Sequence, residues 1–244
     1  MRKFLALIFL TASSVFAQDP EAVAQRMSLG EIIETGGWLM YVLGAMSVIG
    51  LAMIIYFFMV LREERVCPRR FLNELYAELK QRRLDRAAEL CRREDHAAAS
   101  VALAGLEHMD SSREMEPVLL KEIMEGEGSR QASLLQGQIQ YLLDLGVISP
   151  MVGLLGTVMG MLRAFNAVAL DIAKAKPMIL AAGVSQALIT TAAGLLVGIP
   201  AMIFYSYFRG RSSKLISNLE AASADILGEL LEAENAPAEK SSAL

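Results

Sequence analysis

The sequence predicts an all-α membrane protein with three transmembrane helices and a helical insertion between the first and the second. Its 244 residues are 54% hydrophobic and 20% charged, with a mean hydropathy of +0.40. The charges are segregated, because residues 35–61, 145–162 and 177–208 carry none. A helix crosses a hydrocarbon core of about 30 Å with roughly 20 apolar residues, so each stretch can span a membrane. The net charge of −4 and the lack of Lys/Arg clusters among aromatics give no sign of nucleic-acid binding.

Residues 1–17 are predicted to be a cleaved signal peptide. Arg2 and Lys3 provide a positive start, a short apolar run follows, and Val15 and Ala17 place small residues at positions −3 and −1 of a cleavage before Gln18. The alternative is a fourth, uncleaved helix, for which the apolar run is short.

The distribution of basic residues predicts the orientation. Segment 18–36 carries one basic residue, Arg26, whereas segment 62–93 carries ten. Lys and Arg in short flanking segments stay on the cytoplasmic side, so the first span is expected to run from outside to inside. This predicts a multi-pass protein of an inner membrane, with its amino terminus on the outer side and its carboxy terminus in the cytoplasm.

The insertion has helical periodicity. Over residues 71–91 apolar positions fall three and four apart with one slip, which predicts two short amphipathic helices joined near Arg82–Asp85. Pro117 can begin another helix, and no proline interrupts 118–149, so this helix and the second span are expected to be continuous. The polar tail is expected to be disordered from about residue 235. The predicted segments are signal peptide 1–17, periplasmic segment 18–36, transmembrane helix one 37–61, cytoplasmic insertion 62–138, helix two 139–165, periplasmic link 166–176, helix three 177–208 and cytoplasmic tail 209–244.

Small residues line one face of the second and third predicted spans. They recur at steps of three and four, which keeps them on one side of a helix. In lipid, close backbone approach through small residues drives the association of helices. Because a glycine costs about 1 kcal/mol in a helix interior, we interpret the two stripes as facing surfaces of a tight helical hairpin. The stripe glycines are Gly146, Gly153, Gly156 and Gly160 in the second span and Gly183, Gly194 and Gly198 in the third.

Two prolines and a few polar side chains accompany the stripes. Pro150 and Pro200 each remove one backbone donor and are expected to kink their helices. They are either ordinary kinks or positions beside a hydrated passage. We interpret the polar side chains as the lining of such a passage, with helix-to-helix contacts as the alternative. These side chains are Thr157, Gln186, Thr190 and Thr191.

Two segments resemble the ExbB/TolQ/MotA proton-channel family. Residues 148–160 read Ile-Ser-Pro-Met-Val-Gly-Leu-Leu-Gly-Thr-Val-Met-Gly and are similar to the family's second-span segment. Residues 183–195, followed by Ile-Pro-Ala at 199–201, resemble its third-span signature, and residues 84–91 resemble part of its insertion. The resemblance covers most of 35–215, and it is nearest to ExbB and TolQ.

The resemblance implies a subunit of an ion-driven motor and not an enzyme, with no cofactor. Copies of the chain would form a ring, typically a pentamer, around the membrane helices of a single-span partner similar to ExbD or TolR that carries a membrane Asp. Proton flow at the ring–partner interface would drive motion in a TonB-like or TolA-like protein that spans the periplasm. By motif match, Thr157 and Thr191 would be the polar lining residues of spans two and three.

The sequence departs from the family at Gln186, where many ExbB and TolQ members carry Glu. A Gln side chain cannot accept and release a proton at ordinary pH, and no ionisable residue lies on the stripes. We therefore hypothesise that the partner's Asp is the sole titrating carrier, with Gln186, Thr157 and Thr191 bonded to water or to that carboxylate. Replacing Gln186 by Leu is expected to reduce proton-driven activity. The alternative is a non-conducting membrane scaffold that assembles a complex through the same helix faces.

Neither a metal centre nor a nucleophile is predicted. Two cysteines, Cys67 and Cys91, are too few for a disulfide framework. Together with His96 and His108 they have spacings that match no zinc signature. Residues 126–128 (Gly-Glu-Gly) lack the Lys and Ser/Thr of a phosphate loop.

Overall fold

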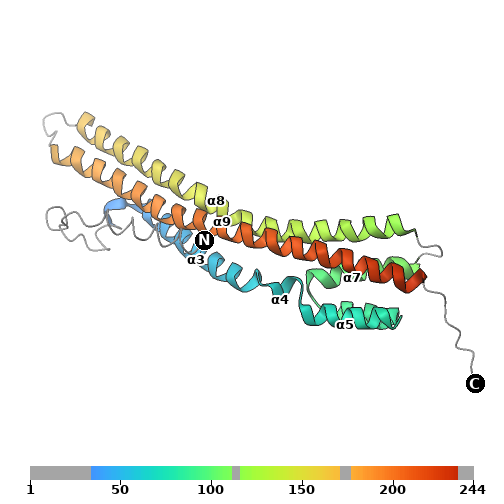
Figure 1. Cartoon of the computed structure of the whole chain (residues 1–244). Coiled ribbons are helices and arrows are strands. Elements are labelled where there is room, and N and C mark those ends of the chain that lie inside the picture. Colours follow the sequence, from blue (N-terminus) through green and yellow to red (C-terminus); the bar gives the residue numbers. More distant parts are fainter. Residues whose placement is uncertain (1–33, 112–115, 171–176, 236–244) are drawn as a thin grey trace, which may run out of the picture. The chain divides into compact units, whose positions relative to one another are not determined.

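The computed structural model describes residues 34–111, 116–170 and 177–235, and the regular elements in these ranges are all α-helices (Figure 1). The predicted signal peptide and the predicted disordered tail lie outside the described residues. The helices are α3 (Trp38–Val60), α4 (Glu63–Val66), α5 (Arg69–Lys80), α6 (Leu84–Arg93), α7 (Ala97–Ser111), α8 (Pro117–Leu170) and α9 (Pro177–Asn235).

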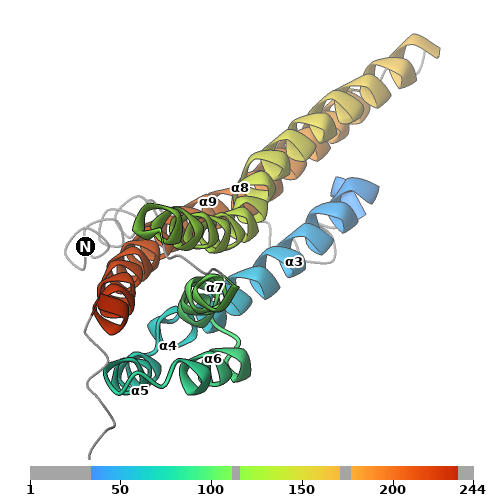
Figure 2. The same ribbon diagram turned by 90° about the vertical axis from the view of Figure 1, so that its right-hand side faces the viewer.

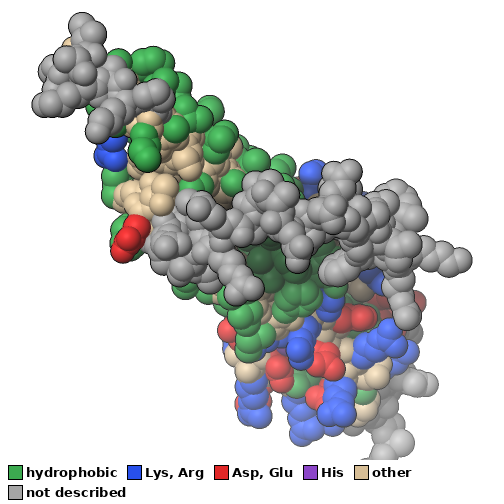
Figure 3. All heavy atoms as spheres, turned by 90° about the vertical axis from the view of Figure 1, so that its left-hand side faces the viewer, with side chains coloured by type: hydrophobic (Ala, Val, Ile, Leu, Met, Phe, Trp, Pro, Cys, Tyr) green, Lys and Arg blue, Asp and Glu red, His purple; other side chains and the backbone are tan. Residues whose placement is uncertain are grey.

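Three of these helices, α3, α8 and α9, are long and apolar enough to cross a membrane. This confirms the prediction of an all-α protein with three candidate spans. The helices α8 and α9 contain 54 and 59 residues, far more than the roughly 20 that a bilayer requires. The charges are segregated along the sequence, and Figure 3 shows one face on which apolar side chains gather in one area and most charged side chains in another.

The helix boundaries follow the sequence patterns closely. α8 begins at Pro117 and continues without a break into its apolar part, which confirms the expected continuity. At its other end α8 extends to Leu170, so part of the predicted link 166–176 is helical. The physical reason is that residues 166–170 (Asn-Ala-Val-Ala-Leu) contain no Gly or Pro to end the helix.

The chain forms two compact units. One unit combines the described residues up to Val42 with Leu154–Ala192. The other combines Leu43–Gly153 with the described residues from Ala193 onward, and so contains the whole insertion between α3 and α8. Both units contain parts of α3, α8 and α9, because each of these helices runs across a boundary between the units.

The insertion is a small helical cluster in which α6 packs against both α5 and α7 (Figure 2). The expected break between α5 and α6 is confirmed, and Arg82 turns the chain there with a φ of 55°. Leu75 and Leu79 of α5 are fully buried. Burial also raises the pKa of the Cys91 thiol of α6 to about 12, so at neutral pH this side chain packs as a small apolar group. The described residues contain no group of three or more His, Cys, Asp or Glu placed to hold a metal ion.

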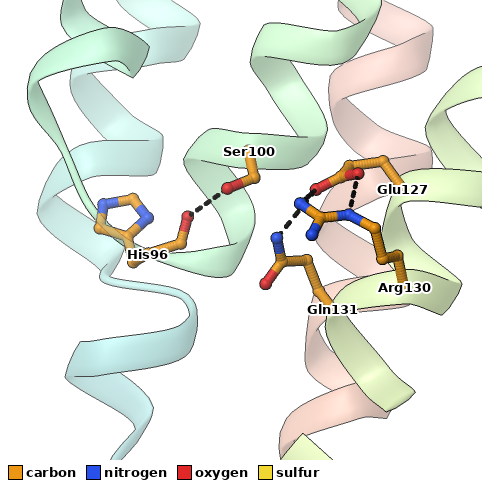
Figure 4. A network of polar contacts seen from close by, with 5 residues as sticks. All are labelled: His96, Ser100, Glu127, Arg130 and Gln131. Atoms are coloured by element: carbon orange, nitrogen blue, oxygen red, sulfur yellow. Dashed lines mark hydrogen bonds and ion pairs between the residues drawn. The ribbon is translucent and has the colours of Figure 1, made fainter. Parts of the chain in front are cut away.

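His96 caps the start of α7. Its Nδ1 accepts a hydrogen bond from the Ala99 backbone N–H at 3.2 Å, and its carbonyl oxygen accepts one from the Ser100 hydroxyl at 3.5 Å (Figure 4). The same view shows Glu127 of α8 accepting hydrogen bonds from Arg130 and Gln131. The His96 ring packs edge-on against Phe71 with centroids 4.4 Å apart. A capping bond of this kind requires a neutral imidazole, since a protonated Nδ1 cannot accept.

We expect the pH dependence of stability to report this cap. Burial lowers the pKa of His96, with the Glu94 and Asp95 carboxylates opposing it. The unfolded chain therefore binds more protons, and stability is lost as the pH falls through the ordinary His pKa of about 6.5. His96→Asn keeps a neutral capping acceptor and should remove this contribution, whereas His108→Asn should retain it. Thermal unfolding at pH values on either side of the transition measures the difference. Equal pH dependence in H96N and the parent would contradict the assignment.

Candidate functional site

In the first unit α8 and α9 approach each other through their small residues. A Cβ atom at Gly156 would lie 2.3 Å from Thr190 Oγ1, and one at Gly183 would lie 2.4 Å from the Ala164 Cβ. A Cβ at Gly160 would lie 3.0 Å from the Gly183 carbonyl oxygen. Side chains larger than hydrogen do not fit at these distances, so glycine is what permits the approach.

The second unit contains a corresponding contact between the same two helices. A Cβ at Gly194 would lie 2.7 Å from the Ser149 carbonyl oxygen and 3.1 Å from the Gly153 Cα. A Cβ at Gly198 would lie 2.8 Å from the Gly146 carbonyl oxygen and 2.8 Å from ring carbons of Pro150. All seven glycines singled out in the sequence therefore take part in contacts between α8 and α9. Pro150 and Pro200 both lie inside their helices.

Thr190 lies inside the contact of the first unit. Its side chain is fully buried, and its hydroxyl donates to the Ala187 carbonyl oxygen at 2.9 Å, with the Gln186 carbonyl at 3.2 Å. Bonding to its own helix satisfies a Thr hydroxyl without any other partner. The position against Gly156 makes Thr190 a packing residue within this chain.

Thr157 is half-buried, and its hydroxyl is oriented by its own helix. Its Oγ1 donates to the Leu154 carbonyl oxygen at 2.6 Å. A hydroxyl has one proton to donate and two lone pairs with which to accept. The proton of Thr157 is used, so its remaining capacity is that of an acceptor, suited to a water molecule or a protonated carboxyl group.

Thr157 and Thr191 lie on the same side of the contact between α8 and α9. Gly156 of α8 and Thr190 of α9 are in contact. Thr157 is the residue after Gly156, and Thr191 is the residue after Thr190. The two helices run antiparallel (Figure 1). In an antiparallel pair of right-handed helices, the residues that directly follow two contacting residues both lie on the same side of the pair. The helices thus bring these two threonines to one flank.

Gln186 lies on the other flank. It precedes Thr191 by five residues, which places the two side chains roughly 140° apart around α9. Its Nε2 is 2.8 Å from the position of a Cβ at Gly37, and Arg163 Nη1 is 3.8 Å from that position. Gly37 has a φ of 72°, which glycine adopts without strain. Gln186 is therefore beside the turn that precedes α3, away from Thr157 and Thr191.

Sequence reasoning missed two features of this region. It did not associate Arg163 or the turn at Gly37 with Gln186, although the pair Gly36-Gly37 directly before an apolar run is a turn signal. It also grouped Thr190 with the other polar residues, because spacing alone does not show which member of a helical cluster the neighbouring helix encloses.

The chain is similar to known Tol-Pal system and biopolymer transport proteins. Residues 93–221 match the MotA/TolQ/ExbB proton channel family. The chain is 34% identical over 129 residues to the Tol-Pal system protein TolQ of Pseudomonas aeruginosa, covering 50% of this chain and 55% of that protein. It is 28% identical over 234 residues to the biopolymer transport protein ExbB of Pseudomonas putida, covering 86% and 69%. With ExbB of Salmonella typhimurium it shares 35% identity over 91 residues, covering 37% and 35%.

The match to the first of these relatives spans about half of that protein's length. The family match covers the part of the chain that contains the α8–α9 contacts and all four predicted polar residues. With three apolar helices, this makes the chain a multi-pass membrane protein. The chain belongs to the MotA/TolQ/ExbB proton channel family.

Proposed function

We propose that the chain is the ring-forming subunit of a proton-driven motor in a bacterial inner membrane. Several copies, most simply a pentamer, would surround the helices of a single-span partner of the ExbD or TolR type that carries a membrane Asp. The ring would transmit motion to a TonB-like or TolA-like protein and so energise transport or envelope processes at the outer membrane. The observation that supports this most is the acceptor hydroxyl of Thr157, which lies beside the glycine contacts between α8 and α9.

The proposed topology follows the basic residues. The segment between α3 and α8 would lie in the cytoplasm together with the extended parts of α8 and α9, and the amino terminus would lie in the periplasm. The ten Lys and Arg residues of 62–93 support this placement. α8 and α9 would then continue from the membrane into the cytoplasm as uninterrupted helices.

In the proposed mechanism the proton is carried by the partner. A carboxyl group in a low-dielectric site favours its neutral form, and that form has an O–H to donate. Thr157 can accept this bond because its own proton is held by the Leu154 carbonyl. Thr191 shares the flank and would line the same passage. Thr190 would serve packing, and Gln186 would act at the Gly37 turn and not together with Thr157 and Thr191 as hypothesised from the sequence.

A non-conducting scaffold is the second candidate function. The observation that favours it is Gln186, which stands where many relatives of the ExbB and TolQ type carry Glu. A scaffold would use the same glycine contacts to fold and the same exposed apolar faces to assemble, with no need for a titrating group.

Isolation of the assembly tests the proposal. The tagged chain would be purified from its own organism in mild detergent and weighed by native mass spectrometry. We expect several copies of the chain together with a smaller protein that has one apolar segment containing an Asp. A single copy, or an assembly without such a partner, would contradict the motor assignment.

A further inference from the structure

We propose that a basic cavity at the cytoplasmic end of α3 binds the phosphate group of an anionic membrane phospholipid. The cavity has a volume of about 820 Å³. Its charged lining consists of four arginines and two glutamates: Arg62, Arg69, Arg70, Arg211, Glu63 and Glu64. All of these residues belong to the second compact unit. The inference rests on the proposed topology, in which α3 crosses the membrane and its end at Val60 lies in the cytoplasm, and it does not depend on proton conduction.

The cavity lies where a lipid headgroup would be. The apolar helix α3 ends at Val60, and the first arginine of the cavity is Arg62. The last turns of α3 present apolar side chains at their surface, with Phe58 43% and Met59 56% exposed. Acyl chains can cover this surface while the headgroup lies among the arginines. A basic cluster immediately cytoplasmic of a membrane helix is a recognised arrangement for anionic lipids.

The arginines come from two distant parts of the chain. Arg211 belongs to α9, and its Nε donates to the Leu61 carbonyl oxygen at the end of α3. Its Nη1 lies 3.4 Å from the Tyr207 hydroxyl. Leu61 supplies one of the carbonyls that a helix end leaves without an internal partner. Arg211 therefore caps α3, and its guanidinium is held in place before any ligand arrives.

The contact between α3 and α9 is supported by aromatic packing directly beside the cavity. Phe208 of α9 is fully buried, with its ring centroid 5.5 Å from that of Phe57 and 5.0 Å from that of Phe58. This packing fixes Arg211, three residues further along α9, next to Arg62. Basic residues can set the orientation of a membrane helix wherever they lie in the flanking segment. Orientation alone therefore does not explain why arginines from two distant segments line one cavity.

The charge balance favours an anion. Among the six charged residues the arginines outnumber the glutamates, and Glu63 is engaged by Arg69 at 3.7 Å. The Arg62 Nε donates to the Phe58 carbonyl oxygen at 3.4 Å, and the two Nη groups of the same guanidinium supply further donors. Guanidinium groups offer paired donors that match phosphate oxygens and are more weakly hydrated than ammonium groups. Only a phospholipid supplies both the phosphate and the apolar chains that the adjoining surface requires.

Lipid titration of the intact assembly tests the proposal. The full-length protein, with any partner that co-purifies, would be placed in neutral phosphatidylcholine nanodiscs and titrated with phosphatidylglycerol or cardiolipin, with bound lipid counted by native mass spectrometry. Arg69→Gln with Arg70→Gln is expected to weaken binding by roughly tenfold or more. The matched control, Arg92→Gln with Arg93→Gln on α6, removes the same charge away from the cavity and should leave binding unchanged.

Three results would overturn the proposal. They are equal losses in the two double variants, no preference for anionic lipid over phosphatidylcholine, and displacement of the lipid by inorganic phosphate at comparable concentration. The last result would identify a soluble phosphate site instead. Thermal unfolding of each variant checks that the fold is retained, and Arg70→Gln alone provides a milder change at the same cavity. Failure of lipid binding would leave the motor assignment untouched, because the native assembly and its proton flux are measured separately.

Discussion

Replacing Gly194 with alanine is expected to separate α8 from α9 and to destabilise the protein severely. The new Cβ would lie 2.7 Å from the Ser149 carbonyl oxygen and 3.1 Å from the Gly153 Cα. Both are backbone atoms, so no side-chain rotation can relieve the overlap and the helices must move apart. Overpacking in a well-packed core costs about 1–3 kcal/mol, and more where the backbone must shift. We expect a loss at or above the upper end of that range.

Gly210→Ala is the matched control for this prediction. Gly210 lies on the same helix, and apart from its own chain neighbours and the adjacent helix backbone, no atom in the described part of the chain comes within 4 Å of its Cβ position. Alanine favours a helix over glycine by about 1 kcal/mol, so this variant should be slightly stabilised. The folded fraction in a denaturing-detergent titration measures both changes. If the two substitutions shift stability in the same direction, the close approach at Gly194 is not what holds the helices together.

Replacing Thr157 and Thr191 together with valine is expected to reduce proton flux through the assembled complex by about tenfold or more, the equivalent of roughly 1.4 kcal/mol in the barrier. Valine has nearly the shape of threonine, so the helix contact should survive. The substitution removes the acceptor that Thr157 presents to a protonated carboxyl group. Proton uptake by proteoliposomes that contain the complex, followed with a pH-sensitive dye, measures the effect.

Thr190→Val is the control for the threonine pair. The Thr190 hydroxyl bonds to carbonyls of its own helix and is enclosed against Gly156. Its loss should leave flux close to that of the parent. A complex that conducts normally with both Thr157 and Thr191 replaced, and fails with Thr190 replaced, would show that the passage runs through the contact between the helices and not along its flank.

Much of the fold could be predicted from local signals. Charge-free stretches identify α3 and the apolar parts of α8 and α9, because the bilayer excludes charges over a fixed thickness. The change of helical phase near Arg82 marks the end of α5, and the proline at 117 marks the beginning of α8. Both signals are local, because each acts within a single turn of helix. The glycine stripes could be found because helix packing repeats with the helical period.

The arrangement of polar groups could not be predicted in the same way. Thr157, Gln186 and Thr191 look equivalent along the sequence, yet the side of the helix pair on which each lies depends on which residues form the contact. The hydrogen bond from Arg211 to the Leu61 carbonyl joins residues 150 positions apart. No periodicity encodes such a pairing, because it results from the packing of Phe208 against the end of α3.

Proton flux through the native assembly tests the central claim most directly. The purified complex of this chain and its single-span partner would be placed in proteoliposomes with an imposed pH gradient. We predict that the gradient collapses when both proteins are present and holds when the partner's membrane Asp is replaced by Asn. An intact ring that holds the gradient with the unaltered partner would contradict the account and favour the scaffold.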